Sequence, residues 1–145
     1  MLNRFVFHKC QGRSTADAVI CSESRAIGSN RFPKKKIITI FEPISATARS
    51  SIFQNEFRDS LAASDKVIIA KQDLATTALG GTDLDGEKLA REISGKGSPS
   101  VCVKALPDLR KLIDEYAEDN AVLLILSNRT CLGLWESDFV QALKA

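Results

Sequence analysis

Cations and hydrogen-bond donors gather in two stretches of this sequence, after residues 37–42 and after residues 121–126. Arginine, serine, threonine and asparagine side chains in such places suit an anionic ligand, either a carboxylate, a peptide terminus or a phosphate. The same residue types also serve as ordinary loop caps, and composition alone does not separate the two interpretations. The candidate residues are Ser45, Thr47, Arg49, Ser127, Asn128, Arg129 and Thr130.

The two stretches need a scaffold that brings them together. Short apolar runs bounded by turn residues predict buried strands, and amphipathic periodicity predicts helices between them. Strands that alternate with helices require right-handed crossovers and a mostly parallel sheet with helices on both faces, which is an α/β fold. The strands are expected over 37–42, 66–71, 101–105 and 121–126, with a further short strand at 4–8. The helices are expected near 50–64, over 86–96 behind an Asp83 or Asp85 cap, from Pro107 onward, and over 136–144.

Such a sheet also fixes where the polar loops emerge. The carboxyl ends of parallel strands lie at one edge, and ligands of open α/β sheets bind there. We therefore expect the loops at 42–49, 72–83 and 127–133 to converge on that edge.

Composition excludes several classes of function. The chain has 145 residues, 44% of them hydrophobic and 26% charged, which suits a single globular domain. No apolar run approaches the roughly 20 residues of a membrane span. Residues 1–36 carry eight Lys or Arg against two Asp or Glu, but few aromatic residues interleave with them. A solvated loop around Lys34–Lys36 explains this charge better than a nucleic-acid surface does.

The cysteines and the histidine support neither a metal site nor a nucleophilic triad. Cys10, Cys21, Cys102 and Cys131 form no C-x-x-C pair, which is typical of reduced thiols in a cytoplasmic protein. His8 is the only histidine, so no Ser/His/Asp or Cys/His system is expected. Cys131 lies close to Arg129, which could lower its pKa, but an inert residue filling space at a strand end is the preferred interpretation.

One segment has the outline of a phosphate loop. Residues 81–88 read Gly-Thr-Asp-Leu-Asp-Gly-Glu-Lys, but the lysine of a true phosphate loop follows the second glycine directly. Here Glu87 intervenes, and its carboxylate would repel a phosphate. The segment is interpreted as a capped helix start. The sequence also has no Gly-x-Gly-x-x-Gly after a strand and no Gly-x-Ser-x-Gly elbow.

The stretch from residue 31 to residue 43, Arg-Phe-Pro-Lys-Lys-Lys-Ile-Ile-Thr-Ile-Phe-Glu-Pro, resembles the opening of the C-terminal domain of the Mur ligases, the ATP-dependent amide ligases of peptidoglycan synthesis. Phe41-Glu42-Pro43, Ser45-Ala46-Thr47 and Phe53-Gln54 are similar to the murein peptide ligase branch, which joins a recycled tripeptide to UDP-N-acetylmuramate. Further similarity follows at 60–67, where a helix passes into a strand, and at Leu126-Ser127-Asn128, which precedes Gly133 and a final helix.

The resemblance implies a three-layer, Rossmann-like domain over residues 31–145, with residues 1–30 as a remnant of the interdomain hinge. It implies that Ser45, Thr47 and Asn128 lie in the loops that contact an anionic UDP-muramoyl or peptide substrate and that Arg49 pairs with a carboxylate, whereas no nucleotide-binding residue is assigned. Arg129 joins these predicted substrate-binding residues because of its residue type and its place in the loop after residues 121–126. In that family ATP and Mg²⁺ are held by a central ATPase domain, so the chain would bind neither alone and would not catalyse ligation without that partner.

A second hypothesis comes from another functional class. The murein peptide ligase branch usually has an arginine where this chain has Ile44, and Gly-Gly where it has Arg129-Thr130. These differences favour a stand-alone α/β module that binds a ligand or a partner without ligase activity. Both hypotheses place the protein in the cytoplasm.

Overall fold

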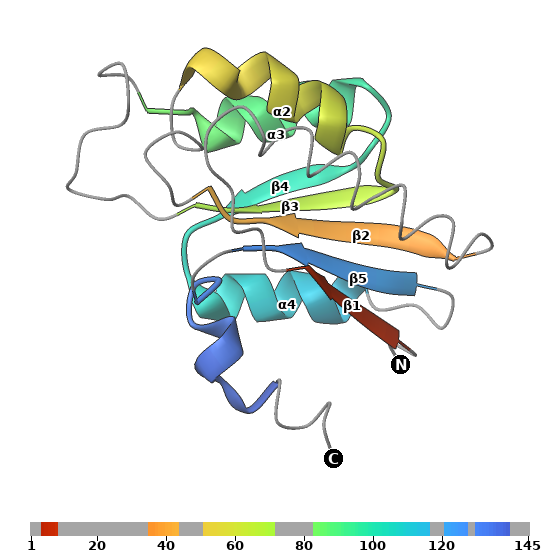
Figure 1. The fold of residues 1–145 in the computed structure, drawn as a ribbon, viewed down its shortest axis with the longest axis vertical. Coiled ribbons are helices and arrows are strands. Elements are labelled where there is room, and N and C mark those ends of the chain that lie inside the picture. Colours follow the sequence, from red (N-terminus) through yellow and green to blue (C-terminus); the bar gives the residue numbers. More distant parts are fainter. Residues whose placement is uncertain are drawn as a thin grey trace.

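The computed structural model describes residues 4–8, 35–43, 51–71, 83–116, 121–127 and 130–139. Within these ranges five parallel strands form one open sheet in the order β1-β5-β2-β3-β4 (Figure 1). The strands are β1 (Arg4–His8), β2 (Lys36–Phe41), β3 (Lys66–Ala70), β4 (Ser100–Val103) and β5 (Ala121–Leu126).

The predicted strands are confirmed, with ends that differ by at most two residues. The apolar runs of β2, β3 and β5 are buried on both sides, as β5 shows with six buried residues in succession. That pattern is typical of a parallel sheet covered by helices on both faces. The edge strand β4 leaves Val101 exposed. The division of the chain near residue 30 stays a prediction, but β1 lies before it and pairs along its whole length with β5.

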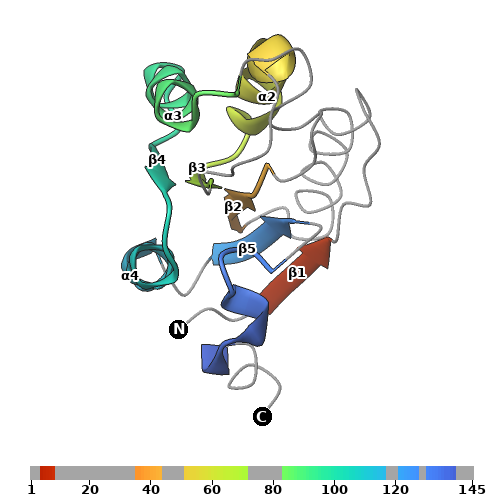
Figure 2. The same cartoon turned by 90° about the vertical axis from the view of Figure 1, so that its left-hand side faces the viewer.

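Helices cover the two faces of the sheet and give the three layers that were predicted (Figure 2). On one face, α2 (Gln54–Leu61) and α3 (Gly86–Gly95) bury Phe57, Leu61, Leu89 and Ile93 against the odd-numbered side chains of β2 and β3. On the other face, α4 (Leu106–Tyr116) buries Leu109 and Ile113 against the even-numbered ones, together with residues 131–134. No helix in the described ranges is long and apolar enough to cross a membrane.

Two helix predictions need correction. The predicted helix near 50–64 begins as the 3₁₀ turn η1 (Ser51–Phe53), so Ile52 does not share the buried face of Phe57 and is 60% exposed. A 3₁₀ turn advances by three residues per turn, which rotates Ile52 away from the stripe expected of a continuous α-helix. The chain after residue 133 likewise forms the 3₁₀ turn η2 (Leu134–Glu136) where the predicted last helix was expected to begin, and residues 140–144 of that helix lie outside the described ranges.

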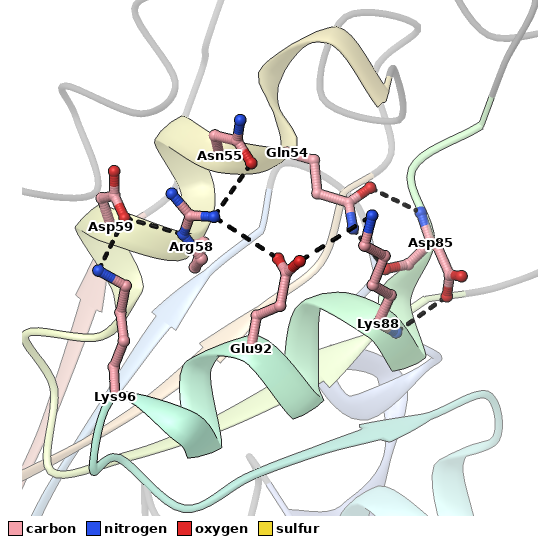
Figure 3. A network of polar contacts seen from close by, with 8 residues as sticks. All are labelled: Gln54, Asn55, Arg58, Asp59, Asp85, Lys88, Glu92 and Lys96. Atoms are coloured by element: carbon pink, nitrogen blue, oxygen red, sulfur yellow. Dashed lines mark hydrogen bonds and ion pairs between the residues drawn. The ribbon is translucent and has the colours of Figure 1, made fainter.

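A polar network joins α2 to α3 on the outside of the molecule (Figure 3). Gln54 accepts a hydrogen bond from the Asp85 N–H at 3.2 Å and donates to the Asp85 carbonyl oxygen at 3.4 Å. The Asp85 carboxylate accepts from the Lys88 N–H at 2.9 Å, which confirms the predicted helix cap. The remaining ion pairs are exposed or half-exposed, and pairs of that kind contribute little to stability. They are Arg58–Asp59, Arg58–Glu92, Lys88–Glu92 and Lys96–Asp59.

Gly86, the first residue of α3, packs closely against the sheet. A methyl group added at Gly86 would lie 2.8 Å from Cys102 Sγ and 3.1 Å from Lys71 Cδ. We expect Gly86→Ala to lower the free energy of unfolding by about 1–3 kcal/mol, as overpacking of a close-packed interior usually does. Denaturant unfolding monitored by circular dichroism would measure the change.

Two further variants make this test specific. Cys102→Ala should recover part of the loss in the Gly86→Ala background, since it removes the closer of the two contacts. Gly95→Ala is the matched control, because nothing lies within 4 Å of a methyl group at that position. Equal stability of the Gly86→Ala and Gly95→Ala proteins would contradict the packing described for α3.

Candidate functional site

The strand order places the candidate site between β2 and β5. The chain runs from β2 through β3 to β4 in one direction, then returns by way of α4 to β5 on the other side of β2 (Figure 2). Connections that leave two neighbouring parallel strands in opposite directions create a crevice at their carboxyl ends, where ligands of open α/β sheets bind. The loops that follow β2 and β5 carry the cations and donors singled out in the sequence.

The structure describes the residues that directly follow β2 and β5, but not every residue predicted to line this crevice. Glu42 and Ser127 directly follow the two strands and are described. They lie at the same edge of the sheet, so the predicted convergence of the loops after β2 and β5 holds at their first residues. The other predicted contacts lie outside the described ranges and stay predictions: Ser45, Thr47, Arg49, Asn128 and Arg129.

The base of the crevice is held by the carboxylate of Glu42, which is only 4% exposed. Glu42 Oε1 accepts hydrogen bonds from the Ser127 hydroxyl at 2.6 Å and the Cys131 N–H at 3.2 Å. Glu42 Oε2 accepts from the Leu132 N–H at 2.8 Å, and the Glu42 N–H donates to the Leu126 carbonyl oxygen at 3.0 Å. A buried carboxylate requires such donors, and here one loop supplies all three of them.

The backbone of that loop has an uncommon shape. Cys131 and Leu132 have φ angles of 53° and 56°, and Gly133 follows with a φ of 91°. Left-handed conformations are unfavourable for residues with a Cβ, by about 1–2 kcal/mol each. This turn directs two successive N–H groups into one concavity, and such concavities bind anions. The Glu42 carboxylate fills it from within the chain and thereby stabilises the left-handed turn.

This arrangement corrects the role expected for one residue of the loop. Ser127 was a candidate for a donor to an external anion, but its hydroxyl donates to Glu42. Thr130 Oγ1 accepts a hydrogen bond from the Gly133 N–H at 3.2 Å, which stabilises the turn and leaves the predicted donor role of its hydroxyl proton a prediction. An external anion at this crevice must therefore rely on residues other than the 131–132 amides, which are already bonded to Glu42.

Cys131 has the inert role that the sequence favoured. Its side chain is fully buried among the apolar residues on the α4 face. Burial and the nearby negative charge of Glu42 both raise the pKa of the Cys131 thiol far above its usual range. A thiol that stays protonated is a poor nucleophile and a poor metal ligand. The described residues also contain no group of three or more His, Cys, Asp or Glu side chains that could hold a metal ion.

Sequence reasoning named Glu42 as the end of a strand and as part of the Phe41-Glu42-Pro43 resemblance, but missed its contacts with the loop after β5. A signal was present, because an acidic residue directly after five apolar or β-branched residues is placed where the chain is still buried. The hydrogen-bond donors to Glu42 could not be predicted from the sequence, since Ser127 and Leu132 are 85 and 90 positions away along the chain. Gln54 was quoted for the resemblance, but its two bonds to the backbone of Asp85 were not anticipated either.

The Glu42 contacts lead to a prediction about stability. In Glu42→Gln one carboxylate oxygen becomes an NH₂ group, so at least one of the two backbone N–H groups would face a donor instead of an acceptor. We expect the free energy of unfolding to fall by about 1–3 kcal/mol, measured by chemical denaturation.

Glu136→Gln is the matched control, because Glu136 is exposed on η2 close to the same loop. This control should change stability by less than about 0.5 kcal/mol, as exposed substitutions usually do. If the two variants were equally stable, the carboxylate would not be holding the loop.

Comparison with known proteins adds to this geometry. No protein-family model and no curated protein matches the sequence. Among solved structures, a domain from a Haemophilus ducreyi protein, described as a UDP-N-acetylmuramate:L-alanyl-γ-D-glutamyl-diaminopimelate ligase, is 15% identical. That match has a TM-score of 0.65 and covers 98% of this chain and 94% of that domain.

Two longer ligases match as well. A murein peptide ligase from Psychrobacter arcticus is 14% identical with a TM-score of 0.71, and the match covers 98% of this chain and 28% of that one. The UDP-N-acetylmuramate–alanine ligase of Thermotoga maritima is 18% identical with a TM-score of 0.60, and the match covers 88% of this chain and 24% of that one. The chain thus spans about a quarter of each of these two ligases. It therefore has the fold of a Mur ligase domain, as the resemblance of its sequence implied.

Proposed function

We propose that this chain is the substrate-binding, C-terminal-type domain of an ATP-dependent Mur-type amide ligase of peptidoglycan synthesis or recycling. The observation that carries the proposal is the fold itself: almost the whole chain matches one domain of such ligases, with a TM-score of up to 0.71. The crevice at the ends of β2 and β5 supports the binding role, because it is where this class of sheet binds ligands.

The residues proposed to bind the substrate come from the loops that flank the crevice. Arg49 and Arg129 are the cations, and arginine suits a carboxylate because its guanidinium donates two parallel hydrogen bonds. Ser45, Thr47 and Asn128 are proposed to supply neutral hydrogen bonds that orient the ligand. Glu42 would act indirectly, by holding the start of the second loop against the first.

ATP and Mg²⁺ are assigned to a partner domain in this proposal. The only segment of the chain that resembles a phosphate loop begins α3, and its Asp85 carboxylate is bonded to the Lys88 N–H. Glu87 stands where a phosphate loop requires lysine, so the residues of this segment do not fit a nucleotide phosphate. Acyl-phosphate chemistry would take place on the central domain, and this chain would deliver the amino acid or peptide.

The proposal also covers location and partners. Cys102 and Cys131 are free thiols, which is typical of proteins in a reducing compartment, so we place the protein in the cytoplasm. The partners would be a central ATPase domain, in the same or a separate chain, and an anionic UDP-muramoyl or peptide substrate. In the alternative function, the chain is a stand-alone module that binds the ligand, and no ligation takes place with any ATPase domain.

Calorimetric titration of the chain tests the binding role. We expect UDP-N-acetylmuramate or the peptide L-alanyl-γ-D-glutamyl-diaminopimelate to bind. Arg49→Ala should weaken that binding about tenfold, because a charged hydrogen bond to an oxyanion is lost. Arg91→Ala is the control, since Arg91 is an exposed cation on α3. Unchanged affinity in Arg49→Ala would remove Arg49 from the site, and no binding of either compound would contradict the binding role.

A second experiment separates the ligase role from the stand-alone module. A Mur ligase ATPase domain with a matching interface should turn over ATP and form the amide bond when this chain is added. ATP turnover and product formation would be followed together. Binding without turnover, in the presence of every such partner tried, would favour the stand-alone module.

A further inference from the structure

Gln54 is a buried amide that joins the starts of two helices. It is the first residue of α2 and is only 8% exposed. Its Nε2 donates to the Asp85 carbonyl oxygen at 3.4 Å, and its Oε1 accepts from the Asp85 N–H at 3.2 Å (Figure 3). Asp85 is the N-cap of α3. One side chain therefore connects α2 to α3 across 31 positions of the sequence.

Both helices start at the edge of the sheet where the crevice lies. In a parallel sheet each connecting helix begins after the carboxyl end of a strand. Here α2 comes after β2, and α3 comes after β3. Gln54 also lies five positions after Arg49, the cation proposed to bind the ligand. The Gln54–Asp85 pair thus lies where the chain returns from the two loops that follow β2 and β3.

The chemistry of the pair suits a primary amide. The side chain of glutamine offers an acceptor oxygen and N–H donors, and the Asp85 backbone offers one N–H and one carbonyl oxygen. A carboxylate at position 54 would keep the bond to the N–H and lose the donor, and a thioether would lose both bonds. Because the amide is buried, water does not compete well for either bond.

The contact is not needed merely to hold the two helices on the sheet. Apolar side chains of both helices are already buried there, among them Phe57, Leu89 and Ile93. Apolar burial has no preferred direction, so it leaves the relative shift of two helices loosely determined. A pair of hydrogen bonds requires a defined distance and angle, and so it fixes the start of α2 relative to the start of α3.

Further contacts continue from α2 to the base of the crevice. Phe57 of α2 packs against Phe41 at the end of β2, with ring centroids 4.7 Å apart. Phe41 directly precedes Glu42, whose carboxylate holds the loop after β5. A displacement of α2 would therefore act on the loop that precedes it and on the strand end beside the crevice.

We propose that Gln54 is a positioning residue for the ligand. Its amide fixes α2 against the start of α3 and thereby places the residues that precede α2, Arg49 among them, for binding. This inference rests on the proposed function, because it concerns how the same site is held in place. It also makes the start of α3 part of the support of the site, although no residue of α3 contacts the ligand in this proposal.

Removal of both hydrogen bonds tests the proposal in the full chain. Gln54→Met keeps an unbranched side chain of similar length and neither donates to nor accepts from Asp85. The ligands are UDP-N-acetylmuramate and the peptide L-alanyl-γ-D-glutamyl-diaminopimelate. For whichever of them the unsubstituted protein binds, we expect Kd to rise about tenfold by calorimetry, because the binding residues are less well placed.

The control for this titration is Ile93→Val, which weakens the core at the other end of α3 and leaves Gln54 untouched. Its Kd should stay within about twofold of that of the unsubstituted protein. If Ile93→Val raised Kd as much as Gln54→Met does, Gln54 would act only through stability and the inference would be overturned. An unchanged Kd in Gln54→Met would also overturn it and leave the proposed function standing.

A double substitution tests whether Gln54 acts through Arg49. Independent residues would multiply their effects, so Arg49→Ala and Gln54→Met, at about tenfold each, would together raise Kd about a hundredfold. If Gln54 places Arg49, the combined rise should stay close to that of Arg49→Ala alone. A hundredfold rise in the double variant would overturn the inference.

Hydrogen exchange provides a test without any substitution, which serves if Gln54→Met folds poorly. Because coupling between sites is reciprocal, bound ligand should stabilise the Gln54–Asp85 pair. Exchange at the Asp85 N–H should therefore slow more on addition of saturating ligand than exchange at the Lys96 N–H, at the opposite end of α3. Equal slowing at both amides would overturn the inference. If neither compound binds the unsubstituted protein, the proposed function fails and the inference fails with it.

Discussion

The carboxylate of Glu42 is the constraint on which the rest of the candidate site depends. It joins the end of β2 to the loop after β5 through three donors that lie 85 to 90 positions away along the chain. Without those donors a buried carboxylate would be strongly unfavourable, and without the carboxylate the left-handed turn at 131–133 would lose what stabilises it. Each therefore requires the other, and together they fix the base of the crevice.

Much of the fold could be predicted from the sequence, and less of the site. Apolar runs such as residues 121–126 specify buried parallel strands, and the Asp85 cap fixes where α3 starts. The helix predicted near 50–64 starts later than expected because periodicity does not show that a helix begins with a 3₁₀ turn. The contacts of Glu42 are set by tertiary structure, so no spacing rule reveals them. Arg49 and its neighbours in the loops were chosen from residue type alone, and their role in binding stays a prediction.

Hydrogen exchange at the backbone amides of Cys131 and Leu132 tests the central claim most directly. If the Glu42 carboxylate holds both N–H groups in a buried turn, they should exchange as slowly as amides in the middle of β5, by global unfolding alone. The measurement is made on the unsubstituted protein under native conditions. If the Cys131 and Leu132 amides exchanged orders of magnitude faster than the Leu124 amide, the turn would open locally. That result would contradict the role assigned to Glu42, because the base of the crevice would then not be fixed by its carboxylate.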